Sequence, residues 1–149
     1  MQPTSWSTAA QATRHCLTGC AAGEIAGMVL ASALSWGNGT TIVVSLLLAF
    51  VFGYALTVRG VLRAGLPLGR AVRIAFASDT VSIATMEVVD NGFIALIPGA
   101  LAAGLGTFLF WWTLALSLGI AFLVAWPVNR WLISRGRGHA VVHRIHEHA

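Results

Sequence analysis

The stretch Ala77-Ser-Asp-Thr-Val-Ser-Ile-Ala-Thr-Met-Glu-Val-Val-Asp-Asn91 decides how this chain folds. It is as apolar as a membrane segment, yet it carries three acidic residues, Asp79, Glu87 and Asp90. An acidic residue at the centre of a membrane helix costs roughly 2.5–3.5 kcal/mol on insertion scales. We therefore expect these carboxylates to face a polar interior, with the rest of the chain arranged around them.

The composition of the 149 residues is that of an integral membrane protein. Hydrophobic residues make up 57% of the chain and charged residues only 9%, which is too apolar for a soluble domain of this length. All nine basic residues are arginines at the ends of apolar segments. Such clusters report orientation and contact with anionic headgroups, so the net charge of +4 does not indicate nucleic-acid binding.

Apolar runs separated by glycine and proline predict an all-α, polytopic bundle of four transmembrane helices, arranged as two hairpins. The expected helices cover residues 14–36, 41–62, 73–97 and 104–126. Asp90-Asn91-Gly92 is itself a turn signal, so the third helix is expected to break or unwind there. The predicted organisation is a polar lead over 1–13, the helical domain over 14–134, and a basic, histidine-rich cytoplasmic tail over 135–149.

The arginines also predict the orientation. The loop over 63–70 and the segment after residue 126 are basic, whereas the other two loops carry no basic residue. The positive-inside rule then places both termini in the cytoplasm. We expect a multi-pass protein of the cell inner (plasma) membrane.

Two cysteines, Cys16 and Cys20, lie four positions apart in the first helix. Their Cβ atoms would be about 6 Å apart, too far for a disulfide, so free thiols are expected. Small residues recur every three or four positions at Cys16, Cys20, Gly23, Gly27 and Ala31. This spacing is typical of a helix face that packs closely against a partner helix.

The first and third helices run in the same direction, so counting about 1.5 Å per residue compares depths in the membrane. The count places Glu24 level with Glu87 near the middle, Asp90 toward the outside and Asp79 toward the cytoplasm. The predicted ladder of sulfur and carboxylate groups consists of His15, Cys16, Cys20, Glu24, Asp79, Met86, Glu87 and Asp90.

This donor set has more than one interpretation. Sulfur with imidazole and carboxylate suits a transition metal such as copper, zinc or iron, whereas carboxylates alone suit protons or hard cations equally well. Cys16, Cys20 and Met86 could be packing residues. The acids could make structural hydrogen bonds, although intramembrane carboxylates are by default functional, and Asp90 could serve to cap the helix.

Four histidines follow Arg135, at His139, His143, His146 and His148. The first three share a helical spacing that could gather a metal or sense pH. An amphipathic basic tail on the headgroups is the alternative. No nucleotide-binding loop or hydrolase motif is present.

Several motifs resemble those of a bacterial multi-span membrane family that is known as a domain of unknown function. They are His15-Cys-Leu-Thr-Gly-Cys-Ala-Ala-Gly-Glu24, Ser78-Asp-Thr-Val-Ser-Ile83, Met86-Glu-Val-Val-Asp-Asn91 and Pro127-Val-Asn-Arg-Trp131. The resemblance extends from about Arg14 to His143. It implies a membrane fold and no particular activity.

The sequence leads to three functional hypotheses. The first is a small permease or channel for a cation, with a transition metal favoured, working as a homo-oligomer in the lipid bilayer. The alternatives within transport are protons or alkali ions without metal. The second hypothesis is a non-transporting accessory subunit of a membrane complex. An enzyme is the least favoured, because no nucleophile and base pair can be named.

Overall fold

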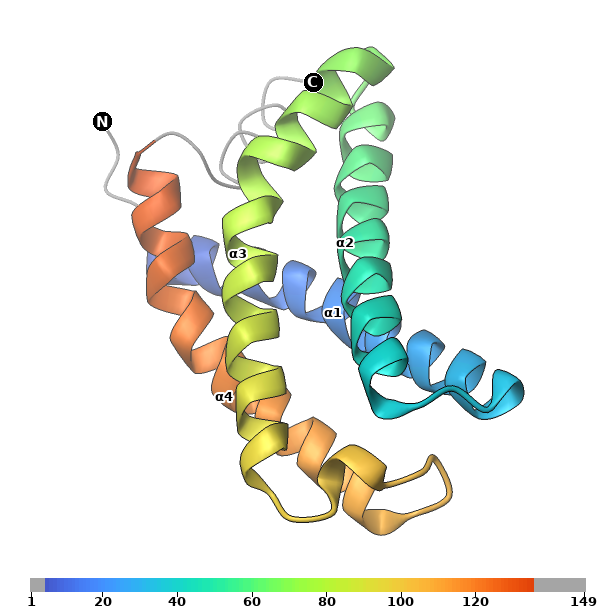
Figure 1. The fold of residues 1–149 in the computed structure, drawn as a ribbon. Helices are drawn as coiled ribbons and strands as arrows, with labels where there is room; N and C mark the ends of the chain where they lie inside the picture. The colour runs from blue at the N-terminus through green and yellow to red at the C-terminus, as the bar shows by residue number, and fades with distance from the viewer. Residues whose placement is uncertain (1–4, 136–149) are drawn as a thin grey trace.

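A computed structural model describes residues 5–135, and the C-terminal histidines with the rest of 136–149 lie outside the described residues. The described chain is all-α (Figure 1). It contains α1 (Trp6–Leu34), α2 (Asn38–Arg63), α3 (Leu68–Leu96), the short 3₁₀ helix η1 (Ala100–Ala102) and α4 (Phe108–Ser134). The predicted all-α bundle of four long helices is thereby confirmed.

Along the chain α2, α3 and α4 alternate in direction, and α1 crosses behind them (Figure 1). In Figure 1, α2 and α4 lie on either side of α3. Both α1 and α3 pack against each of the other long helices. The centre of the bundle is therefore the space between α1 and α3.

Three of the four long helices, α1, α2 and α4, are long and apolar enough to cross a membrane. The fourth, α3, is equally long at 29 residues, but its acids and arginines make it more polar. It packs against α2 on one side and α4 on the other. Its three acids are buried inside the bundle, whereas Arg70 and Arg73 are exposed.

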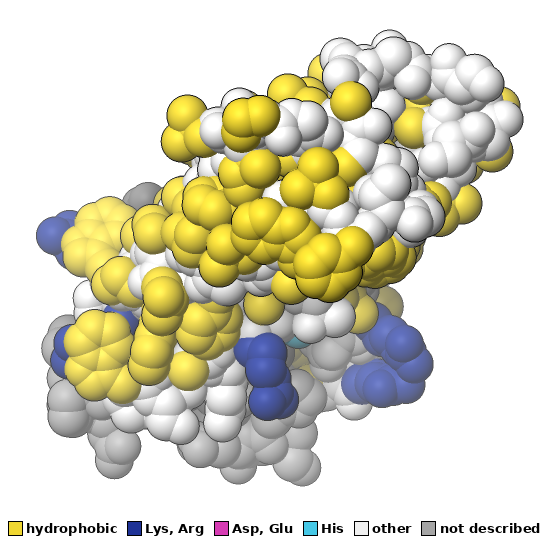
Figure 2. All heavy atoms as spheres, turned by 90° about the horizontal axis from the view of Figure 1, so that it is seen from below, with side chains coloured by type: hydrophobic (Ala, Val, Ile, Leu, Met, Phe, Trp, Pro, Cys, Tyr) yellow, Lys and Arg dark blue, Asp and Glu magenta, His cyan; other side chains and the backbone are white. Residues whose placement is uncertain are grey.

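The surface agrees with a lipid environment. Figure 2 shows a broad hydrophobic surface, arginine side chains gathered to one side of it, and no acidic side chain visible on this face. Large apolar side chains are exposed along all four long helices, among them Leu47, Phe76, Val88 and Leu123. Such extensive apolar exposure is unfavourable in water and favourable in a bilayer.

The predicted start of the first helix at Arg14 is wrong. The helix begins at Trp6, after Ser5 caps it by accepting a hydrogen bond from the Thr8 backbone N–H at 3.1 Å. A serine in that position satisfies an otherwise unpaired N–H group. Ala9 and Thr13, expected in a polar lead, are fully buried.

The predicted break at Asp90-Asn91-Gly92 is also wrong, because α3 continues to Leu96. Asn91 does not turn the chain, and its amide instead donates to the Glu87 carbonyl one turn earlier, at 3.0 Å. The helix ends directly before Pro98, as expected. The fourth helix differs at both ends: it begins at Phe108 and runs through Pro127 to Ser134.

Close packing of α1 on α2 explains the small residues of α1. A Cβ atom on Gly19 would lie 2.7 Å from the Gly53 Cα atom, and one on Gly23 or Gly27 would overlap Ala49 or Ser45. Gly23 and Gly27 therefore do the close packing that their spacing predicts. Cys16 and Cys20 lie on a different face, toward α3.

Candidate functional site

The candidate site is the row of side chains between α1 and α3, which we call the buried ladder. It consists of Cys16, Cys20, Glu24, Asp79, Ser82, Met86, Glu87 and Asp90. Within this row Cys20 of α1 contacts Met86 of α3. The predicted ladder member His15 lies outside the row, beside Thr57 of α2.

Contacts fix the register of the buried ladder. The Cys20 Sγ–H group donates to Met86 Sδ at 4.0 Å, and the same thiol lies close enough to Glu87 to interact with it. One turn earlier, Cys16 lies near Asp79 and Ser82. One turn later, Glu24 interacts with Asp90 and Glu87.

The four acids of the ladder are buried. Their exposed fractions are 0% for Asp79, 1% for Asp90, 3% for Glu87 and 8% for Glu24. Burying a carboxylate without full compensation is costly, so the fold maintains this cluster against a considerable penalty.

Three of the acids have one oxygen held by a neighbouring side chain. Ser117 on α4 donates its hydroxyl to Asp90 Oδ1, Ser78 donates to Asp79 Oδ1 at 2.8 Å, and Asn91 donates to Glu87 Oε2 at 3.2 Å. These donors fix the orientation of each carboxyl group. Ser117 also ties the ladder to α4.

Other oxygens of the cluster have no hydrogen-bond partner within residues 5–135. They are Glu24 Oε1, Glu87 Oε1 and Asp90 Oδ2, all buried. Buried polar atoms without a partner are rare in native proteins and call for an explanation, such as a water, an ion or a functional role. All three of these atoms belong to acids that interact with one another.

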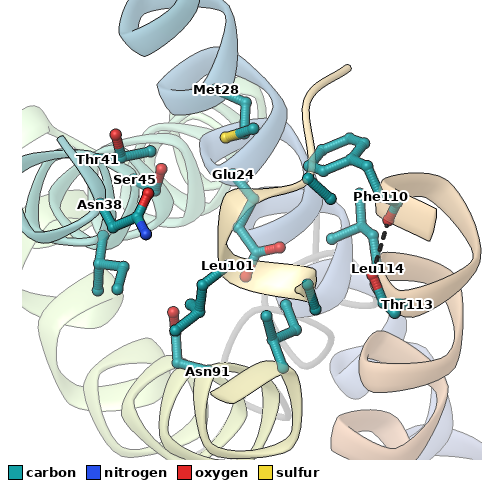
Figure 3. A pocket seen from close by; sticks show the side chains of 14 residues that line it. Glu24, Met28, Asn38, Thr41, Ser45, Asn91, Leu101, Phe110, Thr113 and Leu114 are labelled. Atoms are coloured by element: carbon teal, nitrogen blue, oxygen red, sulfur yellow. Dashed lines mark hydrogen bonds between the residues drawn. The ribbon is translucent and has the colours of Figure 1, made fainter. Parts of the chain in front are cut away.

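A cavity adjoins the Glu24 end of the ladder (Figure 3). Its volume, counted as space open to the centres of water molecules, is about 70 Å³, enough for several waters. In Figure 3, Glu24 extends from α1 toward Leu101, with Asn38, Thr41 and Ser45 of α2 on one side and Phe110 and Leu114 of α4 on the other. Asn91, which holds Glu87, lies at its edge.

The arginines lie at the opposite end of the bundle. The cavity is lined by the start of α2, by η1 and by the start of α4, whereas Arg59, Arg63, Arg70 and Arg73 flank the turn between α2 and α3. The buried ladder lies between these two ends. Polar contacts continue past Asp79, where Asn129 donates to Thr13 at 2.9 Å.

The predicted ligand His15 lies toward α2. Its Nε2 atom is 2.9 Å from Thr57 Oγ1, so the ring links α1 to α2 at the arginine end. Cys16 and Cys20 are both free and buried, as their spacing predicts. Across residues 5–135, no group of three or more His, Cys, Asp or Glu side chains is placed so that it could hold a metal ion.

Three residues of the site escaped the sequence reasoning. Ser117 and Ser82 are ordinary small residues in apolar helices, and no local pattern distinguishes them. Asn91 was interpreted as a helix breaker. Its spacing of four from Glu87 was the available signal, because side chains at i and i+4 lie on the same helix face.

Comparison with known proteins gives a family but no activity. No curated protein and no solved structure matches this chain. The family model described as "Domain of unknown function (DUF4396)" matches residues 5–138, which includes all four long helices and the whole buried ladder. The chain therefore belongs to the DUF4396 family.

Proposed function

We propose that this protein is a small permease that passes a monovalent cation, a proton or an ion of similar charge, along the buried ladder. Glu24, Glu87 and Asp90 are the groups that receive the cation from the cavity. Asp79 is the acid nearest the arginine end.

One observation carries the proposal: Glu24, Glu87 and Asp90 lie close enough to interact with one another, while one oxygen of each of these three has no hydrogen-bond donor within residues 5–135. A purely structural acid would have its lone pairs satisfied. In Glu87 and Asp90 one oxygen is anchored and the other is left as an acceptor. Such an arrangement suits transfer of a cation between neighbouring carboxyl groups with little movement of the side chains.

The ladder's direction also supports transport. It runs from the cavity at one end of the bundle toward the arginines at the other. By the positive-inside rule the arginine end faces the cytoplasm, so the cavity faces outward. This orientation supports our proposal that the protein lies in the inner membrane of a bacterial cell.

The proposal does not involve a transition metal. Cys20 donates to Met86, and His15 lies beside Thr57 on α2, so the sulfur and imidazole groups have other contacts. All the ladder acids come from one chain. The homo-oligomer expected from the sequence stays a prediction and is not needed to assemble the ladder.

The test is flux into liposomes that contain the purified protein. A potassium gradient with valinomycin sets the membrane potential, and an internal dye reports proton entry, with sodium and ammonium substituted in parallel. Glu24→Gln, Glu87→Gln and Asp90→Asn are each expected to reduce flux at least about tenfold, the effect of losing a charge-assisted interaction. Tyr54→Phe is the control, because it removes a hydroxyl that bonds Thr80 between α2 and α3, outside the ladder.

Flux that equals the protein-free rate in correctly folded wild type would overturn the proposal and favour the accessory-subunit hypothesis. Flux that persists unchanged in all three acid variants would also overturn it, because the cation would then take another path.

A further inference from the structure

The cavity beside Glu24 is lined by polar groups on one side and by apolar groups on the other, and this difference points to the class of its ligand. We propose that it binds a small primary ammonium ion, R–NH₃⁺ with a short alkyl group, with its nitrogen on the Glu24 carboxylate. The inference rests on the proposed function, since it names a cation that binds at the cavity end of the buried ladder.

The charge of the lining selects a cation. Glu24 is the charged residue among those that line the cavity, and no arginine or histidine of the described chain joins it there. Its Oε1 atom is buried without a hydrogen-bond partner in residues 5–135, and its side chain extends into the cavity (Figure 3). A bound cation with N–H donors would satisfy that oxygen.

The remaining polar groups can accept hydrogen bonds from such a nitrogen. Ser45 and Asn38 lie on the α2 side of the cavity. Asn91 already uses its amide N–H on Glu87, so it can offer a ligand its carbonyl oxygen. An ammonium group has three donors to distribute among these oxygens and Glu24.

The opposite wall is apolar. It consists of Leu101 in η1, Ala103 directly after it, and Phe110 and Leu114 on α4. Thr113 belongs to the same wall, but its hydroxyl donates to the Leu109 and Phe110 carbonyls. Among the side chains on this side only Thr113 offers a hydrated alkali ion an oxygen, whereas an alkyl group would be buried favourably and the ring of Phe110 can attract a cation.

The size of the cavity limits the ligand. A volume of about 70 Å³ corresponds to about five water-sized groups. Methylammonium, ethylammonium and propylammonium fit that limit.

Binding is measured by isothermal titration of ethylammonium chloride into the detergent-purified full chain, with ammonium, potassium and ethanol as comparison ligands. We expect ethylammonium to bind better than ammonium, by about fourfold per added carbon, and ethanol and potassium to bind weakly or not at all. Glu24→Gln should weaken ethylammonium at least about tenfold. Leu101→Ser, on the exposed side of the cavity, should reduce the preference for ethylammonium over ammonium.

Asp79→Asn separates this inference from the proposed function. Asp79 does not line the cavity, so this variant should bind ethylammonium like the wild type while it loses flux. The inference would be overturned if ethanol bound as tightly as ethylammonium. It would also be overturned if folded Glu24→Gln bound ethylammonium as tightly as the wild type. Potassium binding as tightly as ethylammonium would overturn it too, in favour of an inorganic cation, and would leave the flux proposal intact.

Discussion

Cys20 on α1 and Met86 on α3 meet through their sulfur atoms, 4.0 Å apart, although 66 positions separate them in the chain. The contact sets the register of the two helices. With Cys20 opposite Met86, Glu24 comes to lie beside Asp90 and Cys16 beside Asp79. The register thereby brings together acids that are far apart in the sequence.

The closely packed interface between α1 and α2 should not tolerate an added side chain. A Cβ on Gly23 would overlap the Ala49 backbone, and overpacking costs about 1–3 kcal/mol. We expect Gly23→Ala to lower the free energy of unfolding, measured by denaturant titration in detergent. Gly119→Ala on α4 is the matched control: a Cβ there meets nothing within 4 Å, so it should gain up to about 1 kcal/mol from helix propensity. If both substitutions changed the free energy of unfolding equally, the close packing of α1 on α2 at Gly23 would be contradicted.

Ser117 should matter for stability because it holds a buried acid. Ser117→Ala removes the hydroxyl that donates to Asp90, and a buried acceptor left unsatisfied costs about 1–3 kcal/mol. Ser134→Ala serves as its control, since that exposed hydroxyl bonds only the Trp131 carbonyl of its own helix. The control should change stability by less than about 0.5 kcal/mol. If Ser117→Ala were as stable as Ser134→Ala, the contact between α4 and the buried ladder would be disproved.

Asn91 should position Glu87 and not break the helix. In Asn91→Ala the Glu87 carboxyl loses a donor, so we expect flux to fall by a factor of about 3–10, the effect of one hydrogen bond. Helix content by circular dichroism should stay unchanged, because α3 is continuous through this position. A gain in helix content would restore the interpretation of Asn91 as a breaker.

The two thiols should resist modification while the protein is folded. Cys16 and Cys20 are each 1% exposed, so a maleimide can reach them only after local opening. Mass spectrometry of the native protein in detergent should find neither labelled, and both labelled after unfolding. Ser32→Cys, at an exposed position of α1, provides the positive control and should label at once. Rapid labelling of Cys20 would show that the ladder is open to water.

The sequence predicts the ladder well because its pairing depends only on helix direction and rise per residue. Two packed helices with Cys16, Cys20 and Glu24 on one and Asp79 to Asp90 on the other allow little choice of register. Ser117 was not predictable, since the rotation of α4 depends on packing that no local pattern records. The continuous helix through Asn91 and Gly92 was not predictable either. Both residues favour turns, and tertiary packing overrode that preference.

The helix start at Trp6 was missed for a similar reason. The residues before Arg14 are polar or small, and their burial comes from contacts far along the chain. Trp6 stacks edge-on against Trp126, with ring centres 5.6 Å apart, and Ala9 and Ala12 pack with Ile133. These partners lie more than a hundred positions away, beyond the reach of hydrophobic periodicity.

The most direct test of the central claim is proton and ammonium flux into liposomes for two matched proteins, Glu87→Gln and Tyr54→Phe, beside the wild type. Glu87→Gln removes the charge of a ladder residue, whereas Tyr54→Phe removes a hydroxyl that contacts Thr80 of α3 outside the buried ladder. The account predicts flux in the wild type and in Tyr54→Phe, and at least about a tenfold loss in Glu87→Gln. Equal flux in all three proteins, each shown to be folded and inserted, would contradict it.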